Sequence, residues 1–283
     1  MSDQERVNDG SPDTGGPAPI IFLDDISVTF KTRTGSILHP NKVQAVRNLT
    51  LKLMPGETLG IVGESGCGKS TTANVMCGLQ APTSGKVYFK GKDVTKRTAD
   101  MRRTIGRVIS VVFQDPATAL NARMSVHDQL LDPLKVHKIG DKESRESRVI
   151  ELIEMVGLPS SVLDALPGQL SGGQRQRVAI ARALSLSPDA IIADEPTSAV
   201  DVSVRAQILN LLMDLKRDLG LSMVFISHDI QTVRYISDRI VVMNAGQAVE
   251  RGTSEEVFAH PKDDYTRLLL GAAPSLLHPE LGK

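Results

Sequence analysis

A glycine-rich run at residues 63–70 has the residue types and the spacing of a loop that binds phosphate. It follows an apolar run at Thr58–Val62 and precedes a segment of helical character, so its backbone N–H groups would face an anion. Lys69 would pair with the β- and γ-phosphate oxygens, and the Ser70 hydroxyl would ligate Mg²⁺. An ordinary glycine-rich turn is the less favoured alternative in this setting. The candidate phosphate-binding residues are Gly63, Glu64, Ser65, Gly66, Cys67, Gly68, Lys69, Ser70 and Thr71.

Two adjacent carboxylates follow another apolar run, Ala190–Ala193. We expect Asp194 to hold Mg²⁺ through water and Glu195 to orient or deprotonate the attacking water. A charged pair could also be a solvated strand end, but the phosphate-loop pattern elsewhere in the chain favours a nucleotide site. Ligands bind at the carboxyl ends of strands in open α/β sheets, which is where this pair would lie.

A histidine and a second glycine-rich segment complete the candidate site. His228 follows the apolar run Met223–Ser227 and falls where a γ-phosphate sensor would lie, although a lone histidine is more often structural. Residues Leu170–Gln174 precede a helix that extends to about Leu184, which makes a second helix N-terminus able to bind phosphate. One monomer has no evident use for two such loops.

The elements that must position these residues follow a strand–helix alternation. Continuous apolar runs at 58–62, 108–113, 190–193, 223–227 and 240–243 are typical of strands covered on both faces in a parallel sheet, so we expect an α/β fold. A helix carrying Ile208, Leu211, Leu212, Leu215 and Leu219 should end at Gly220. The stretch from about Pro116 to Gly168 has only helical character, which indicates a helical subdomain inserted into the α/β core.

Composition narrows the function classes. Lys and Arg together number 33, as do Asp and Glu, so no net charge draws this 283-residue chain to nucleic acid. No uncharged apolar run approaches the roughly 20 residues needed to cross a bilayer. Cys67 and Cys77 lack metal-site spacing, which favours reduced thiols in the cytosol. Residues 1–19 have the composition of a disordered tail.

At Leu170, Ser171, Gly172, Gly173 and Gln174 the sequence resembles the signature motif of the ABC-type ATPase family. The resemblance implies ATP and Mg²⁺ as ligands and a head-to-tail dimer, in which this loop closes on the ATP held by a second subunit of the same or a related chain. It implies an α/β phosphate-loop NTPase fold: a RecA-like parallel sheet core with an N-terminal antiparallel β portion and an inserted α-helical subdomain. The corresponding domains are residues 20–270, with the helical subdomain at about 116–187, and a C-terminal tail at 271–283.

Three further positions match the family singly. Gln114 resembles the glutamine that touches Mg²⁺ and links the site to the helical insert, and Asp201 resembles the end of a dimer-contacting loop. Phe30 is similar in position to the aromatic residue that stacks on adenine. A core phenylalanine in its strand is the alternative, since aromatic residues mostly serve packing.

Within the family, the segments 113–116, 120–123 and 260–266 resemble the dipeptide, oligopeptide and nickel importer group, although Ala119 and Ala122 stand where that group usually has Ser and Pro. The resemblance implies an ATP-hydrolysing subunit, peripheral on the cytoplasmic face of the membrane, that powers peptide uptake through separate permease subunits and indirectly serves an external solute-binding protein. It implies no nucleic-acid partner. A nickel or other small-solute importer and a soluble ABC ATPase not coupled to transport remain alternatives.

Overall fold

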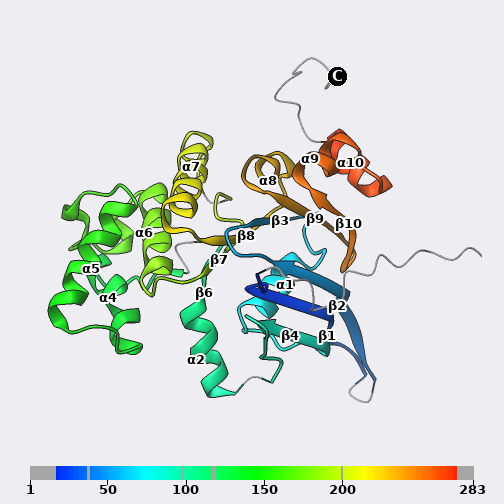
Figure 1. The fold of residues 1–283 in the computed structure, drawn as a ribbon, viewed down its shortest axis with the longest axis horizontal. Coiled ribbons are helices and arrows are strands. Elements are labelled where there is room, and N and C mark those ends of the chain that lie inside the picture. The colour runs from blue at the N-terminus through cyan, green and yellow to red at the C-terminus, as the bar shows by residue number, and fades with distance from the viewer. Residues whose placement is uncertain (1–16, 37–38, 97, 116–118, 199, 273–283) are drawn as a thin grey trace, which may run out of the picture.

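The computed structural model describes residues 17–272, except for 37–38, 97, 116–118 and 199. Two β-sheets lie beside a group of helices (Figure 1). Most of the predicted tails, residues 1–19 and 271–283, falls outside the described residues, and the division of the chain into domains stays a prediction. No helix within the described ranges is long and apolar enough to cross a membrane.

The central sheet has the strand order β10-β9-β3-β8-β7-β6. The pairs from β9 through β6 are parallel, and β10 runs antiparallel to β9 at one edge. Every residue of β3 and β8 is buried, which explains their continuous apolar sequences and confirms the α/β class. The strands are β3 (Thr58–Val62), β6 (Ile109–Val112), β7 (Ala190–Asp194), β8 (Ser222–Ser227), β9 (Arg239–Asn244) and β10 (Gln247–Thr253).

A second sheet, antiparallel, has the order β2-β1-β4-β5. Its strands are β1 (Ile21–Ser36), β2 (His39–Leu53), β4 (Ser84–Phe89) and β5 (Lys92–Asp93). The helix that follows β3, α1 (Lys69–Met76), contacts β1, β2 and β7. This sheet and α1 therefore cover one face of the parallel sheet.

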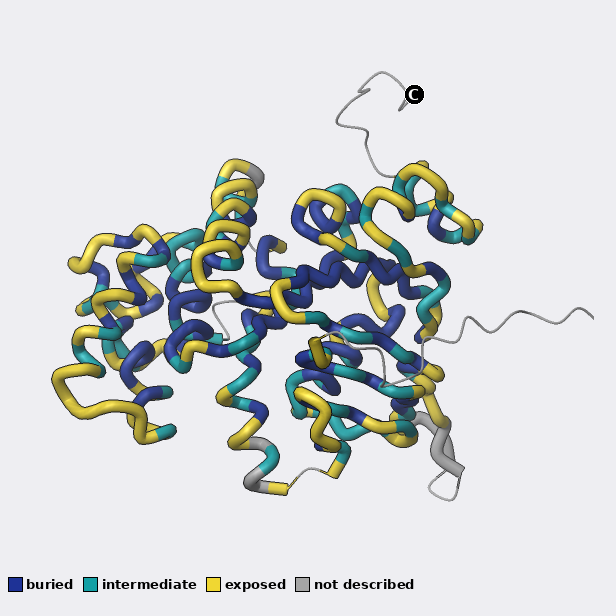
Figure 2. Tube along the Cα trace, viewed as in Figure 1, coloured by how far each residue is buried: buried dark blue, intermediate teal, exposed yellow. Residues whose placement is uncertain are grey.

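The side chains of the parallel strands alternate between two apolar clusters. Ile61 and Val241 belong to the cluster shared with β1, β2 and α1, whereas their neighbours Val62 and Val242 belong to the cluster shared with the long helices. Successive side chains of a strand point to opposite faces, so the sheet separates two cores. Figure 2 shows most of the length of these strands as buried, at the centre of the molecule.

Between β6 and β7 the described residues contain helices and loops but no strand, as the sequence pattern indicated. Ser125 begins α4 by accepting the Asp128 N–H at 3.1 Å, and Gly157 follows α5 in the left-handed conformation. These helices lie together on the side of the parallel sheet away from β1 and β2 (Figure 1). The helices are α2 (Ala99–Val108), just before β6, then α4 (Val126–Val136), α5 (Lys142–Met155), η1 (Ser160–Val162), η2 (Pro167–Gln169) and α6 (Gly172–Leu184).

The C-terminal part returns to the sheet alternation. Helix α7 (Val202–Leu219) ends at Gly220, whose φ of 64° matches the predicted stop. The turn between β9 and β10 contains Ala245 and Gly246, both at positive φ. The remaining helices are α8 (Ile230–Ile236), α9 (Ser254–Ala259) and α10 (Asp264–Ala272).

Candidate functional site

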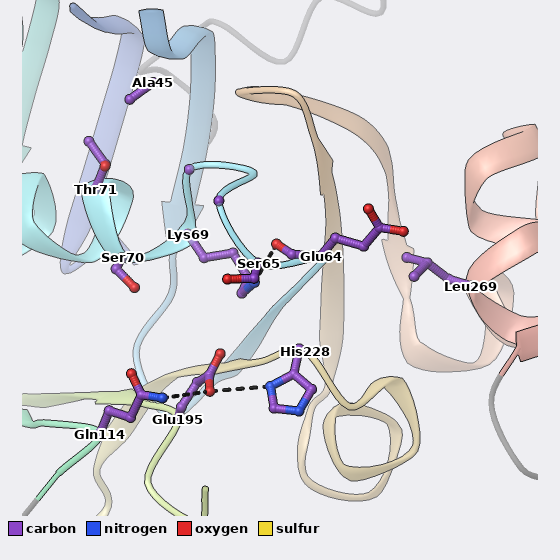
Figure 3. A pocket seen from close by; sticks show the side chains of 12 residues that line it. Ala45, Glu64, Ser65, Lys69, Ser70, Thr71, Gln114, Glu195, His228 and Leu269 are labelled. Atoms are coloured by element: carbon purple, nitrogen blue, oxygen red, sulfur yellow. Dashed lines mark hydrogen bonds and ion pairs between the residues drawn. The ribbon is translucent and has the colours of Figure 1, made fainter. Parts of the chain in front are cut away.

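A cleft of roughly 590 Å³ opens at the carboxyl ends of β3, β6, β7 and β8. Because parallel strands end at one edge of the sheet, residues distant in sequence meet there. Figure 3 shows Lys69 and Ser70 facing Gln114, Glu195 and His228 across this cleft. The lining residues are Ala45, Glu64, Ser65, Gly66, Gly68, Lys69, Ser70, Thr71, Gln114, Glu195, His228 and Leu269.

The loop after β3 is held at both ends by close backbone contacts. A Cβ on Gly63 would lie 2.1 Å from the Met243 carbonyl oxygen, and one on Gly68 would lie 2.4 Å from the Ala45 carbonyl oxygen. Gly68 also has φ of 106°, which other residues rarely adopt. Glycine is therefore needed at both ends for the loop to lie against β9 and β2.

The Lys69 side chain points into this loop. Its ammonium group donates hydrogen bonds to the carbonyl oxygens of Gly63 at 2.7 Å and Glu64 at 2.9 Å. The residue is only 5% exposed, so the charge lies inside the turn. A phosphate group in the cleft can replace these carbonyls as the hydrogen-bond acceptor.

Asp194 lies beside Ser70, which lines the cleft, and the two side chains share a hydrogen bond. Burial raises the pKa of the Asp194 carboxyl, and a hydrogen bond with the Ser70 side chain opposes the shift. The Oδ1 atom of Asp194 is buried without a hydrogen-bond partner among the described residues. Buried polar atoms are normally paired, so an unpaired carboxylate oxygen beside a hydroxyl fits a hard cation.

Glu195 receives two side chains on one oxygen atom. Gln114 donates from Nε2 to Glu195 Oε2 at 3.2 Å, and His228 Nδ1 lies 3.2 Å from the same atom. The Glu195 backbone has φ of 48°, and its N–H donates to the Ile226 carbonyl at 2.9 Å. This left-handed conformation, which few non-glycine residues adopt, is fixed at Glu195 by its backbone hydrogen bond to β8.

The signature-like segment forms the start of α6. The Ser171 hydroxyl accepts the Gln174 N–H at 3.2 Å, and the Gln174 side chain accepts the Ser171 N–H at 2.9 Å. This reciprocal cap fixes the helix N-terminus. A Cβ on Gly173 would lie 2.7 Å from Val204 Cγ1, so α6 packs closely on α7. None of residues 170–174 is among the lining residues of the cleft.

Two further predicted residues lie apart from the cleft. Phe30 is 41% exposed, so the alternative of a buried core phenylalanine is wrong. Phe30 is not among the described residues that line the cleft, and its stacking on adenine stays a prediction. Asp201 precedes α7 without a side-chain capping bond, and its dimer contact also stays a prediction.

Sequence reasoning missed Ala45 and Leu269, which line the cleft, and the contact made by Tyr265 beside it. The Tyr265 hydroxyl accepts the Glu64 N–H at 3.0 Å. Ala45 and Leu269 are ordinary apolar residues with no motif to single them out. Tyr265 lies in a segment that had pointed only to a subgroup resemblance, so its contact with the loop had no local signal.

Comparison with known proteins assigns the family. The family model described as ABC transporter matches residues 46–198, more than half of the chain. The chain belongs to the ABC transporter family. The dipeptide transport ATP-binding protein DppF of Haemophilus influenzae is 43% identical over 91% of this chain and 79% of that protein. The oligopeptide transport ATP-binding protein OppF of Escherichia coli is 44% identical over 95% of this chain and 82% of that protein.

Solved ABC cassettes share the fold. The dimeric post-hydrolysis structure of the cassette MJ0796, bound to ADP and Pi, has a TM-score of 0.74 at 32% identity and covers 83% of this chain and 98% of that one. The structure of cbiO1 from Clostridium perfringens, part of the complex cbiONQ, has a TM-score of 0.74 at 28% identity and covers 86% of this chain and 91% of that one. With the family assigned, the chain is an ABC-type ATPase, and its ligand is a nucleotide.

Proposed function

We propose that this chain is the ATP-hydrolysing subunit of an importer of dipeptides or oligopeptides. It acts from the cytoplasmic face of the membrane on separate permease subunits, and an external solute-binding protein delivers the cargo. The cargo class rests on the relatives, which are named as dipeptide and oligopeptide transport proteins. The observation that carries the hydrolytic role is the meeting of Gln114 and His228 on Glu195, across the cleft from Lys69.

ATP binding begins at the loop between β3 and α1. The α1 N-terminus and the backbone N–H groups of the loop attract the phosphates. Lys69 then exchanges the carbonyl oxygens of Gly63 and Glu64 for phosphate oxygens. The ammonium already lies inside the loop, so the exchange needs only a short movement of the side chain.

The residues present also fit Mg²⁺. Ser70, Asp194 and Gln114 would supply oxygen ligands, directly or through water, and the ion would neutralise charge on the phosphates. The unpaired, buried Oδ1 of Asp194 supports this role. Asp194 would supply the carboxylate of the metal site, and Ser70 would supply the hydroxyl beside it.

Hydrolysis is assigned to Glu195. Its carboxylate orients the attacking water and accepts a proton from it, and Gln114 and His228 hold the carboxylate in place. His228 lies 60% exposed at the cleft, where it can also contact the γ-phosphate. Lys69 stabilises the charge that develops on the transferred phosphoryl group.

A second subunit completes each site. Residues 170–174 form a capped helix N-terminus that does not line the cleft of its own chain. In a head-to-tail dimer this N-terminus faces the ATP held by the partner, and Asp201 lies at the subunit contact. ATP binding then closes the dimer and hydrolysis opens it. Gln114 contacts Glu195 and precedes the helices α4–α6 in the chain. These helices would transmit the movement to the permease.

The proposal is tested by purifying the Glu195→Gln variant with ATP from gently solubilised membranes and identifying the proteins that copurify. We expect a multi-span permease and an ABC ATPase subunit. The Lys69→Ala variant is the matched control, because it should bind ATP more weakly and should therefore hold less of the closed dimer at the same ATP concentration. Recovery of ribosomes or nucleic-acid proteins, with no membrane protein, would overturn the transport role. Uptake of labelled dipeptides and oligopeptides by cells with and without the chain then tests the cargo.

A further inference from the structure

The C-terminal helix α10 lies against the nucleotide cleft, although it follows the last strand of the sheet. Leu269 of α10 lines the cleft, and in Figure 3 the Glu64 side chain extends toward it. The Tyr265 hydroxyl accepts the backbone N–H of Glu64 at 3.0 Å, a contact between residues 201 positions apart. The helix therefore contacts the first turn of the phosphate loop.

The start of α10 is fixed to the sheet by its own contacts. Glu250 of β10 is 7% exposed and accepts the N–H groups of Lys262 at 2.8 Å and Asp263 at 3.1 Å. Asp263 in turn accepts the Tyr265 N–H at 2.9 Å. The pKa of Glu250 is lowered despite its burial, because the Thr266 side chain and these N–H groups stabilise the carboxylate. The Tyr265 hydroxyl is thus held at a defined place relative to β10.

The exposed arm of the phosphate loop, Glu64–Gly66, depends on few contacts. Tight packing fixes Gly63 and Gly68, but a Cβ on Gly66 would meet nothing within 4 Å. Glu64 is held through its carbonyl by the Lys69 ammonium at 2.9 Å and the Cys67 N–H at 3.3 Å, and through its N–H by Tyr265. When Lys69 turns to a phosphate, the loop loses the first of these contacts.

We propose that Tyr265 is a positioning residue for nucleotide binding: its hydroxyl keeps the Glu64 arm of the phosphate loop in the binding shape when Lys69 moves to the phosphates. The hydroxyl contacts the loop backbone, so it does not compete with the nucleotide for Lys69. A loop ordered in advance loses less conformational freedom on binding, which raises affinity. The inference deepens the proposed function, since it concerns the same nucleotide site.

The test compares Tyr265→Phe with Arg267→Ala in the full-length chain. Tyr265→Phe removes only the hydroxyl and keeps the ring. Arg267 contacts the Pro261 carbonyl and Asp264, both in or just before α10, so its removal loosens the helix without touching the loop. Titration with fluorescent ATP and ADP analogues, with thermal melting of each variant, separates loop positioning from general stability.

We expect Tyr265→Phe to weaken binding of both nucleotides about three- to tenfold, the effect of one lost hydrogen bond. KM for ATP should rise by a similar factor while kcat is unchanged, because Glu195, Gln114 and His228 keep their contacts. Hydrogen exchange at the Glu64 amide should become faster. Arg267→Ala should bind as the unchanged chain does.

Three outcomes would overturn the inference. Equal nucleotide affinity in Tyr265→Phe would show that the hydroxyl is not needed. An equal loss in Arg267→Ala would show that docking of α10, and not the hydroxyl, matters. If the unchanged chain binds neither nucleotide, the proposed nucleotide site fails and this inference fails with it, whereas the first two outcomes leave the proposed function standing.

Discussion

The side-chain amide of Gln114 donates a hydrogen bond to Glu195 across 3.2 Å, although the two residues are 81 positions apart. Gln114 follows β6 and Glu195 follows β7, and these strands pair in parallel. The contact therefore links the segment that follows β6, and that precedes helices α4–α6, to the carboxylate assigned to hydrolysis.

Replacing Glu195 with Gln should stop turnover and preserve nucleotide binding. A neutral amide cannot accept the proton of the attacking water, so phosphate release should fall about 10²- to 10⁴-fold. Affinity for ATP should stay within about threefold, because Lys69 and the loop are unchanged. Phosphate-release kinetics and equilibrium binding measure the two effects. Glu255→Gln, at an exposed position of α9, is the matched control. Near-normal turnover by Glu195→Gln would remove the assignment of the base.

Lys69→Ala should lose nucleotide affinity while keeping the fold. Charge-assisted hydrogen bonds contribute about 1.5–3 kcal/mol, which corresponds to a loss of roughly 10- to 100-fold in affinity. Glu64 lines the open cleft, so its carbonyl can bond to water instead. ATP should raise the melting temperature of the unchanged chain and of Lys90→Ala. The same ATP concentration should not raise the melting temperature of Lys69→Ala. An unaltered rise would contradict the assignment.

Asp194→Asn should stabilise the nucleotide-free chain and remove its response to Mg²⁺. Burial raises the pKa of Asp194 above its ordinary value, so the folded state disfavours the ionised carboxylate. The stability lost by burying this charge therefore appears as pH rises through the ordinary pKa of an aspartate. At neutral pH a neutral amide avoids that cost. Melting in EDTA should therefore occur at a higher temperature in the variant.

Nucleotide binding by the unchanged chain should strengthen on adding Mg²⁺, whereas binding by Asp194→Asn should not. Ser198→Ala, at an exposed position after β7, controls for local perturbation. A variant that keeps the full Mg²⁺ response would exclude Asp194 from the metal site.

Replacing Gly66 or Gly68 of the loop with alanine should lower the free energy of unfolding by different amounts. Gly66 has φ of 81° and open space around it, so Gly66→Ala should cost only the strain of the left-handed conformation, about 1–2 kcal/mol. Gly68 adds a contact at 2.4 Å with the Ala45 carbonyl, so Gly68→Ala should cost about 2–5 kcal/mol. Denaturant unfolding without nucleotide measures both. Equal costs would mean that the Ala45 strand moves freely away from the loop.

The pair between His127 and Glu146 should make stability depend on pH. The hydrogen bond that His127 Nε2 donates to Glu146 Oε2, at 2.7 Å, raises the pKa of His127 above 6.5, and the same bond lowers the pKa of Glu146 below 4.5. The stability that protonated His127 contributes to the fold is fully present below pH 6.5 and disappears as pH rises through the raised pKa. The glutamate contribution is present above pH 4.5 and disappears as pH falls through the lowered pKa.

The decrease in melting temperature caused by Glu146→Gln should therefore be largest near pH 5.5 and smaller at about pH 8.5. Glu143→Gln, at an exposed position in the first turn of the same helix, should show no such dependence. A loss that is constant across this range would mean that the pair does not stabilise the fold through its charges.

Much of the fold could be predicted because its signals are local. The apolar runs placed β3, β7, β8 and β9 to within a residue or two, and Gly220 marked the end of α7, since its left-handed conformation favours glycine. Glu195 and His228 could be grouped in advance because each follows a continuously apolar run expected to be a parallel strand, and such strands end on one edge, whereas Gln114 was added through the family resemblance. Phe30 was undecided because exposure of a strand residue depends on which elements cover it, and its core alternative failed.

The sequence by itself determined the phosphate loop, the carboxylate pair, the signature segment and the α/β order of the elements. Each of these depends on a short motif or on the periodicity of apolar residues, and both can be recognised within one segment. Only the tertiary structure decided that Lys69 lies inside its own loop, that the Asp194 oxygen is left unpaired beside Ser70, and that Tyr265 contacts Glu64. Such contacts depend on how distant segments pack and on which atoms lose water, and no local pattern records either.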